Sequence, residues 1–473
     1  MDADLFIGGE WVIGEAGTQD NVDPGNGQTV GRVSLASPAQ VDAALQSASA
    51  AFPAWKAKTA IERGAILVRA SQLLRERMDE AAATILLETG KTQADARGEI
   101  QRAIDTLAWN GEQAGRLQGN SYPGLAVGSR RYSTPVPLGV ALLINAWNFP
   151  AVIASRKLGA ALAAGCTVVM KASEFTPAIS RLLVEILDEA GVPKGVVNLV
   201  FGDPAAVTEQ LLESPEVKAV SFTGSTRVGK ILASLAAKHL TRTVFELGGH
   251  APTIIWEDAD IDRVIDITSP AKFGSAGQSC VAPSRYYVHS SLYERFVEAL
   301  AAKAASYVVG HGNDAGVTMG AVAGQQRVDA LVALTDDAVA RGARLVTGGK
   351  QLDRDGFYFE PTVLADVPED ATIMSEEPFG PIAAVVSVDD LDEAIRLANQ
   401  NPYSFTGYLF TDSLAVRKRV VDEVEVANFG INQLSPSLPD TPLGGLGNSG
   451  IGYEGGIEGI LSFTELQLVS ESV

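Results

Sequence analysis

The feature that most constrains the fold is an alternation of short apolar runs with segments of helical periodicity, which begins at about Gly139. Residues 140–145, 166–171 and 196–201 are rich in β-branched side chains, and apolar residues between them recur with the period of an α-helix. Parallel strands need crossover connections, which are usually helical. The alternation therefore predicts an α/β fold built on a parallel sheet.

The helix predicted between the second and third of these strands carries signals at both ends. Thr176 is a residue type that caps helices, Pro177 occupies a first-turn position where proline is tolerated, and Gly191 is typical of a helix end. An apolar stripe runs between them, formed by Ile179, Leu182, Leu183, Ile186 and Leu187. We therefore expect one face of this helix to be buried.

A second series of strands and helices begins after Gly248 and predicts a second α/β domain. Its strands are expected at residues 285–289 and 381–388, and its helices at residues 292–305 and 391–399. The first 118 residues are expected to be mainly helical after a short opening of strands and turns.

Charge and composition limit the classes of partner. A formal net charge of −20 argues against nucleic acid and anionic membranes, because both are bound chiefly through Lys and Arg. The longest uncharged stretch, residues 132–155, is interrupted by three prolines and predicts no membrane span. Asp2, Asp4 and Glu10 stand where a secretion signal would be basic, so a cytoplasmic protein is expected. Two cysteines and four scattered histidines predict neither a disulfide framework nor a metal site.

An anion site is predicted where an apolar strand at residues 217–222 runs into the glycine turn between Gly224 and Gly229. Free backbone N–H groups at the start of the following helix suit a dinucleotide pyrophosphate. An ordinary turn is the alternative, because the segment is not GxGxxG. Glu174 follows another strand and could bind ribose hydroxyls, which favours NAD over NADP, or it could be an exposed helix-start residue.

Three further residues have the chemistry of an active site. Cys280 lies in a loop of small residues, where a thiol can be exposed in a cleft, whereas Cys166 lies within an apolar strand and is expected to be a packed structural thiol. Glu246 ends a strand and could act as a general base or as an ion-paired strand end. Asn148 could donate to developing negative charge or could be a turn residue.

Together these residues stand in the order found in the aldehyde dehydrogenase superfamily, which the chain resembles over essentially its whole length. The matching segments are 137–139, 147–150, 171–174, 222–229, 246–249, 277–280 and 377–381. The resemblance implies that Cys280 is the nucleophile, that Asn148 and the Cys280 N–H form an oxyanion hole, and that Glu246 is the base for hydrolysis. It also implies NAD as the cofactor, with binding residues Trp147, Lys171, Ser173, Glu174, Gly224, Ser225, Gly229, Leu247, Glu377 and Phe379.

The same resemblance implies an α/β fold in three parts. A Rossmann-like cofactor domain is expected at residues 1–118 and 138–247, and an α/β catalytic domain at residues 248–447. A small β oligomerisation flap is expected at residues 119–137 and 456–473, through which the chain would form a homodimer or a homotetramer.

The expected reaction converts a small-molecule aldehyde into the free carboxylic acid. The Cys280 thiolate adds to the aldehyde carbon, hydride passes to the nicotinamide, and water activated by Glu246 hydrolyses the remaining thioester. A non-catalytic homologue is the alternative, and the joint presence of Cys280, Glu246 and Asn148 argues against it.

The substrate is less constrained. Within the superfamily the chain is most similar to bacterial succinate-semialdehyde and 2-oxoglutarate-semialdehyde dehydrogenases, which hold a distal carboxylate with two arginines. Arg156 matches one of these, Ser437 is a further implied substrate contact, and the second arginine position is Gly274. Two classes therefore stay open: a small aliphatic or aromatic aldehyde, for which Gly274 leaves room, and a carboxylate-bearing aldehyde anchored by Arg156.

Overall fold

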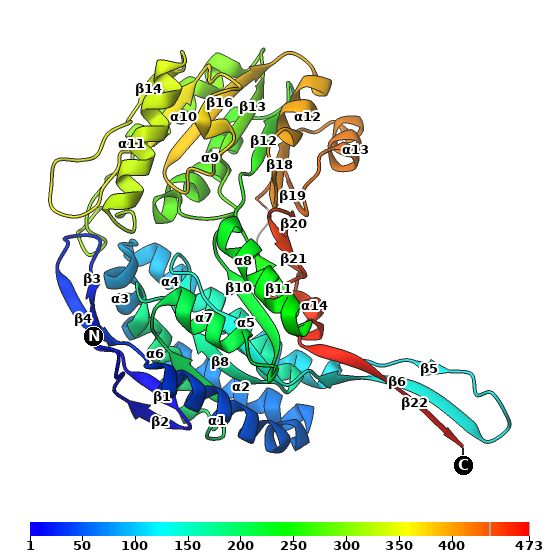
Figure 1. Ribbon diagram of the computed structural model, residues 1–473. Coiled ribbons are helices and arrows are strands. Elements are labelled where there is room, and N and C mark those ends of the chain that lie inside the picture. Colours follow the sequence, from blue (N-terminus) through cyan, green and yellow to red (C-terminus); the bar gives the residue numbers. More distant parts are fainter. Residues whose placement is uncertain (435–436, 473) are drawn as a thin grey trace.

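The computed structural model describes residues 1–434 and 437–472 as two α/β bodies and a projecting arm (Figure 1). The first body contains an eight-stranded sheet, and five of its adjacent strands run parallel. In spatial order the strands are β2 (Glu10–Val12), β1 (Leu5–Ile7), β9 (Val197–Val200), β8 (Thr167–Lys171), β7 (Val140–Ile144), β10 (Val217–Thr223), β11 (Arg242–Glu246) and β21 (Gly450–Ile451). The α/β class and the parallel arrangement predicted from the sequence are confirmed.

The second body contains a seven-stranded sheet that is parallel apart from its β14 edge. In spatial order its strands are β14 (Arg344–Thr347), β15 (Thr362–Ala365), β16 (Ile382–Val388), β13 (Arg285–His289), β12 (Pro252–Ile255), β18 (Thr406–Phe410) and β19 (Asn428–Ile431). Strands β13 and β16 and the helix after each agree with the ranges predicted from periodicity to within a residue.

Helices surround both sheets. Those of the first body are α1 (Pro38–Ala57), α2 (Ala60–Glu76), α3 (Met78–Thr89), α4 (Gln93–Gln113), α5 (Pro150–Ala164), α6 (Pro177–Glu189), α7 (Pro204–Leu212), α8 (Thr226–Ala236) and α14 (Gly456–Leu461). Those of the second body are α9 (Ile261–Phe273), α10 (Tyr293–Ala305), α11 (Gln325–Ala340), α12 (Leu391–Asn399) and α13 (Leu414–Glu423). None of the helices in the described part of the chain has the length and apolar character of a membrane span.

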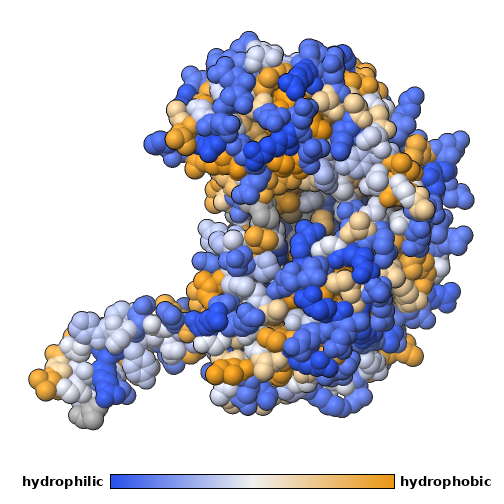
Figure 2. All heavy atoms as spheres, turned by 180° about the vertical axis from the view of Figure 1, so that it is seen from behind, coloured by the Kyte–Doolittle hydropathy of each residue, from blue (hydrophilic) through white to orange (hydrophobic). Residues whose placement is uncertain are grey.

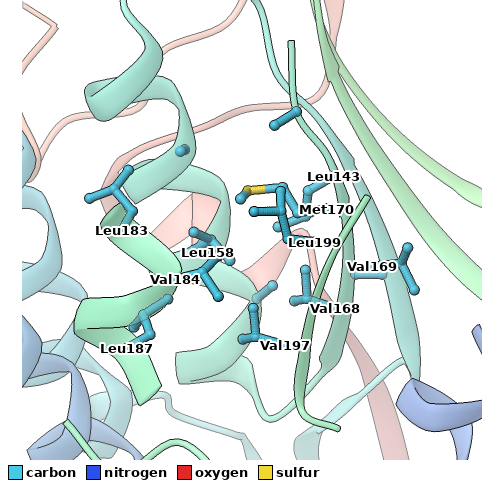
Figure 3. Close-up of a cluster of buried hydrophobic side chains, with 14 of the residues drawn as sticks. Leu143, Leu158, Val168, Val169, Met170, Leu183, Val184, Leu187, Val197 and Leu199 are labelled. Atoms are coloured by element: carbon cyan, nitrogen blue, oxygen red, sulfur yellow. The ribbon is translucent and has the colours of Figure 1, made fainter. Parts of the chain in front are cut away.

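The core of the first body lies between its sheet and helices α5 and α6. Strands β7 and β8 are buried along their whole length, as expected for central strands covered on both faces. Leu158 of α5 and Val184 of α6 join Val168 and Leu199 in one apolar cluster (Figure 3). This packing fixes the carboxyl ends of the strands, where the predicted functional residues follow.

The start of α6 differs from the prediction. Thr176 occupies the N-cap position, but its side chain makes no capping hydrogen bond. The backbone N–H groups of Ala178 and Ile179 instead donate to the carboxylate of Glu88, at 2.7 and 3.0 Å. A buried carboxylate from α3 satisfies these donors and complements the helix dipole, so the cap is tertiary rather than local.

The arm is a three-stranded sheet that combines distant parts of the chain (Figure 1). Strand β22 (Thr464–Ser472) pairs antiparallel with β6 (Ser129–Pro137), which also pairs with β5 (Ser121–Tyr122). Leu466 and Leu468 on β22 are each 56% exposed. The remaining strands form two two-stranded sheets. One pairs β3 (Thr18–Val22) with β4 (Thr29–Ser34), and the other pairs β17 (Tyr403–Ser404) with β20 (Leu446–Gly447).

Candidate active site

Cys280 lies in the loop after α9 and lines a cavity to which residues of both bodies contribute. The space-filling view shows a hollow between the two bodies (Figure 2). The chain turns sharply before Cys280, because Ser275 and Ala276 have left-handed φ values of 49° and 50° and Gly277 continues at 69°. Gly249 lies against this loop: a Cβ there would lie 2.2 Å from the carbonyl oxygen of Cys280. A side chain at position 249 would therefore push the loop out of place.

The surroundings of the Cys280 thiol disfavour its thiolate form. Burial raises its pKa to about 12, with further contributions from the carboxylates of Glu377 and Glu246, while Arg156 opposes them. Cys280 is nevertheless partly exposed to the cavity, whereas Cys166 is completely buried and donates its S–H to the carbonyl of Phe463 at 3.3 Å. Cys166 is thus the packed thiol that the sequence predicted.

Asn148 lies just before α5, and its side chain faces the same loop. Its Nδ2 donates to the carbonyl of Gln278 at 3.1 Å, two residues before Cys280. Lys91 contacts the backbone at Asn148 and the ring of Phe149. Its Nζ donates to the Asn148 carbonyl at 2.6 Å and lies 3.9 Å from the centroid of the Phe149 ring. Lys91 also forms a buried ion pair with Glu99 of α4, which accepts from the first N–H groups of α5.

Glu246 ends β11 and lines a cavity together with Cys280 and Asn148. Both of its carboxylate oxygens are buried and have no hydrogen-bond partner among the described residues. Burial raises its pKa well above the usual range, and the neighbouring Glu454 raises it further, against the opposing charges of Lys157 and Arg156. A carboxyl group in this state is a suitable proton acceptor near neutral pH.

Glu454 belongs to a buried polar network behind Glu246. Lys157 of α5 forms an ion pair with Glu454 and donates to Ser221 Oγ at 2.7 Å. Ser221 in turn donates to the same Glu454 oxygen at 2.9 Å. The network fixes a carboxylate close to Glu246, which explains part of the raised pKa of Glu246.

One cavity of about 210 Å³ collects most of the residues predicted to bind a cofactor. Trp147 and Phe379 meet edge to face in its wall, with ring centroids 5.6 Å apart and an interplanar angle of 87°. Gly248 keeps the cavity open, since a Cβ there would lie 3.0 Å from the Glu377 carboxylate. The lining residues are Ala146, Trp147, Asn148, Thr223, Gly224, Ser225, Leu247, Gly248, Cys280, Arg327, Glu377 and Phe379.

The glycine turn after β10 leads directly into α8, as predicted. Ser225 is the N-cap, and its Oγ accepts from the N–H of Val228 at 3.4 Å. The other N–H groups of this first turn have no intrahelical acceptor and face an anion site by geometry. Gly229 is required where it stands, because a Cβ would lie 2.5 Å from the side chain of Leu247.

Lys171 and Glu174 form an ion pair at 2.7 Å beyond the end of β8. The second Glu174 oxygen accepts from the N–H of Gly202 at 2.9 Å, and Ser173 Oγ accepts from the N–H of Phe175 at 3.2 Å. Glu174 and Trp147 line a neighbouring cavity that continues the first one. The carboxylate is therefore held in a fixed position beside a continuous groove.

Glu377 approaches the same cavity from the second body. Its Oε1 accepts from the N–H of Gly249 at 3.2 Å. Burial raises its pKa to about 8, although Gly249, Arg327 and Lys272 act in the opposite direction. The structure thus brings six of the predicted cofactor residues to the cavity that Cys280 lines, and Glu174 to the neighbouring cavity, whereas Lys171, Ser173 and Gly229 are not in the lining of these two cavities.

A second cavity meets Cys280 from the other side. Arg156, only 7% exposed, donates through Nη2 to the Ser437 carbonyl at 2.8 Å and to Ser437 Oγ. Gly274 is not part of this lining, and a Cβ there would face Asp95 at 3.6 Å, so Gly274 does not enlarge the cavity directly. The lining residues are Arg102, Asn148, Phe149, Val152, Ile153, Arg156, Thr223, Glu246, Ser279, Cys280, Val281, Phe405, Ser437, Leu443 and Glu454.

Several residues of these cavities escaped the sequence analysis. Arg102 lies in the middle of α4, where a charged residue at helical spacing is typical of a solvated face. Arg327 lies on α11 and stacks over the Phe379 ring, with 5.7 Å between the guanidinium carbon and the ring centroid. Lys157, which lies behind the cavity lining and pairs with the lining residue Glu454, carries no local signal either, because Glu454 is 297 residues away. Only the fold brings these groups to the site.

Comparison with known proteins gives a consistent result. The model of the Aldehyde dehydrogenase family matches residues 11–469. The chain is 43% identical to a 4-(hydroxymethyl)benzenesulfonate dehydrogenase of Comamonas testosteroni, over 98% of this chain and 97% of that protein. It is 38% identical to a succinate-semialdehyde dehydrogenase [NADP(+)] of Escherichia coli, over 98% of both chains. The crystal structure of PnpE in complex with nicotinamide adenine dinucleotide superimposes with a TM-score of 0.97 at 35% identity, covering 100% of this chain and 98% of that one.

Proposed function

The chain belongs to the aldehyde dehydrogenase family of enzymes, and we propose that it oxidises an aldehyde to the free carboxylic acid with NAD as the oxidant. The observation that carries this proposal is the convergence of Cys280, Asn148 and Glu246 on one cavity, each from a different element. A nucleophile, an N–H donor and a base are the three groups that oxidation through a thioester requires.

The chain's own residues account for each step. The Cys280 thiol loses its proton to solvent water, and the thiolate sulfur bonds to the aldehyde carbon while the carbonyl π electrons move to oxygen; the resulting thiohemiacetal oxyanion accepts from Asn148 Nδ2 and the Cys280 N–H. Bound NAD supplies the hydride acceptor. A thioester on Cys280 remains after the hydride has left. Glu246 then takes a proton from water, the hydroxide adds to the thioester carbon, and the carbon–sulfur bond breaks to release the acid.

The residues present fit NAD. The free first turn of α8 suits the pyrophosphate, and the aromatic wall of Trp147 and Phe379 lies beside Cys280. Glu174, fixed by Lys171 and Gly202, places a carboxylate where a ribose 2'-phosphate would be repelled. We propose NAD over NADP on this ground, although one relative carries NADP(+) in its name.

We propose three functional units with the boundaries expected from the sequence: a cofactor domain at residues 1–118 and 138–247, a catalytic domain at 248–447, and an oligomerisation flap at 119–137 and 456–473. The exposed leucines of β22 support assembly into a homodimer or a homotetramer through the arm. We also propose a cytoplasmic location.

For the substrate, we favour an aldehyde with a negatively charged group over an uncharged small aldehyde. Arg156 is buried in the cavity, forms no ion pair among the described residues, and leaves its Nε without a partner. A buried unpaired guanidinium is costly unless a ligand supplies an anion. An uncharged aliphatic or aromatic aldehyde is the second candidate, favoured by the apolar side chains Val152, Ile153 and Phe405.

The test is the initial rate of NADH formation over a panel of aliphatic, aromatic and carboxylate-bearing aldehydes, with Cys280→Ala and Glu246→Gln beside the wild type. We expect Cys280→Ala to form no NADH, and Glu246→Gln to form about one NADH per active site before it stops, because the thioester accumulates. The proposal fails if the wild type oxidises none of the aldehydes, or if Cys280→Ala retains the wild-type rate.

A further inference from the structure

The substrate cavity contains a second arginine whose role the family assignment does not supply. Arg102 of α4 lines the cavity together with Arg156 of α5, and helices α4 and α5 pack directly against each other. The Arg102 guanidinium lies 5.5 Å from the centroid of the Phe149 ring, which holds it at the wall. Arg156 is buried and Arg102 is exposed, so the two cations stand at the inner and outer parts of one cavity.

Neither arginine has a carboxylate partner in an ion pair among the described residues. In the described ranges 1–434 and 437–472, neither Arg102 nor Arg156 forms an ion pair, although the chain carries a net charge of −20. The acids nearest to Arg156 offset its charge only in part: none of them forms an ion pair with it among the described residues, and Glu454 is paired with Lys157. The cavity therefore presents to a ligand two guanidinium groups that no ion pair among the described residues occupies.

The wall between the catalytic groups and these charges is apolar. Phe149, Val152, Ile153, Phe405 and Leu443 line the same cavity. A flat hydrophobic body is bound best by such a wall, where aromatic rings contact it in offset or edge-to-face geometry. An anionic group at the far end of that body would then lie beside guanidinium groups, which bind planar or tetrahedral oxoanions through paired N–H donors.

We propose that Arg102 is a specificity-determining residue that, with Arg156, binds the oxoanion of an aromatic aldehyde carrying a sulfonate or a carboxylate opposite its aldehyde group. This proposal rests on the proposed oxidation of an aldehyde at Cys280 and names its substrate class. Arg156 supplies the inner contact, and Arg102 closes the outer side of the anion at the cavity mouth. Arg102, which lies on α4, thus supplies the second positive charge for the substrate anion, because position 274 is a glycine and carries none.

The mutual influence of the two arginines agrees with this arrangement. Burial lowers the pKa of Arg156, Glu454 and Glu246 oppose this, and the charge of Arg102 lowers the pKa further. Two like charges close enough to repel each other are both relieved by one anion placed between them. A bound sulfonate or carboxylate would therefore be stabilised by both groups together.

The first test measures binding without catalysis, by calorimetric titration with 4-methylbenzenesulfonate, which has no aldehyde to oxidise. Arg102→Gln is compared with Arg97→Gln, which removes the same charge from the same helix at an exposed ion pair with Asp79. We expect Arg102→Gln to weaken binding about tenfold, as for loss of a hydrogen bond to a charged group. Arg97→Gln should change binding by less than about twofold.

The second test compares kcat/KM for 4-formylbenzenesulfonate, 4-formylbenzoate and benzaldehyde. Arg102→Gln should lower kcat/KM about tenfold for the two anions and leave benzaldehyde within about twofold of the wild type. The better of the two anions identifies which oxoanion the site prefers. Equal losses for all three aldehydes, or a wild type that prefers benzaldehyde, would overturn the proposal.

The two experiments separate this inference from the proposed reaction. If no aldehyde is oxidised, the proposed function fails, and the titration still decides whether the arginines bind an arylsulfonate. If the aldehydes are oxidised and Arg102→Gln binds 4-methylbenzenesulfonate as tightly as the wild type does, the reaction stands and the role of Arg102 is refuted.

Discussion

Replacing Lys91 by Met tests how the turn that carries Asn148 is held. Lys91 Nζ contacts three groups: the carboxylate of Glu99, the Asn148 carbonyl and the face of the Phe149 ring. The substitution leaves Glu99 buried without its cation. Removal of one partner of a buried ion pair costs about 3 to 5 kcal/mol. Glu99 keeps its bond from the Ala151 N–H at 2.9 Å, so we expect the lower value, about 3 kcal/mol.

The double variant Lys91→Met with Glu99→Gln separates the effect of the unpaired Glu99 charge from the effect of losing the contact that positions Asn148. The amide oxygen introduced by Glu99→Gln can still accept from the first N–H of α5, and no unpaired charge is buried, so most of the lost stability should return. The anchor on the Asn148 carbonyl stays absent, so kcat should remain about tenfold below the wild type in both variants, less than for outright loss of an oxyanion donor.

The assay combines hydrogen exchange of peptides from α4 and the start of α5 with steady-state kinetics, because exchange reports the free energy of local opening. Arg97→Met is the control: its exposed ion pair with Asp79 should be worth less than about 1 kcal/mol. Full recovery of kcat in the double variant would refute the reasoning, since charge balance alone would then position Asn148. A cost below about 1 kcal/mol for Lys91→Met would refute the energetic part.

Three further predictions concern the thiol, a buried acid and the arm. Because the pKa of Cys280 is raised to about 12, its alkylation by iodoacetamide should be slow at neutral pH and should accelerate as pH rises. Mass spectrometry of the alkylated protein should find no label on Cys166, which is buried. The pKa of Glu377 in the folded protein is about 8, above its unfolded value, so its contribution to stability is present at low pH and is lost as pH rises through about 8. In urea unfolding, the free energy of unfolding of Glu377→Gln should therefore exceed that of the wild type by an amount that grows from about pH 5 to about pH 9. A difference that stays constant over this range contradicts the prediction. Replacing Leu466 and Leu468 by Asp should lower the oligomer mass in light scattering if the arm is the interface, and an unchanged mass would remove that role.

The sequence predicted well where a property is local. Strand β8 and helix α12 could be placed because their apolar residues have the right period and their neighbours mark the ends. Glu246 was predicted as a candidate because it ends a strand, Cys280 because it lies in a loop of small residues, and Asn148 because its side-chain N–H can donate to developing negative charge. The roles themselves came from the resemblance to a family, since spacing left an ordinary turn or ion pair open for each.

Residues whose role depends on packing between distant elements could not be predicted. Glu88 caps α6 in place of Thr176, and nothing near Glu88 in the chain identifies its partner. Arg102 has the spacing of a solvated helix face and becomes part of the cavity only because α4 packs on α5. These placements follow from tertiary contacts, which local periodicity does not contain.

The electrostatics of the cavity connect substrate binding to the reactivity of the thiol. Burial, Glu377 and Glu246 all raise the pKa of Cys280, while the charge of Arg156 and a backbone hydrogen bond lower it. An anionic substrate adds negative charge near the sulfur and would suppress thiolate formation if it were bound without compensation. With Arg102 beside Arg156, the anion is neutralised at its own end of the cavity, and Arg156 retains part of its effect on the thiol. Loss of Arg102 should therefore shift the pH dependence of kcat for an anionic aldehyde to higher pH and leave that for benzaldehyde unchanged. A shift of the same size for both substrates would mean that Arg102 acts on Cys280 directly rather than through the bound anion.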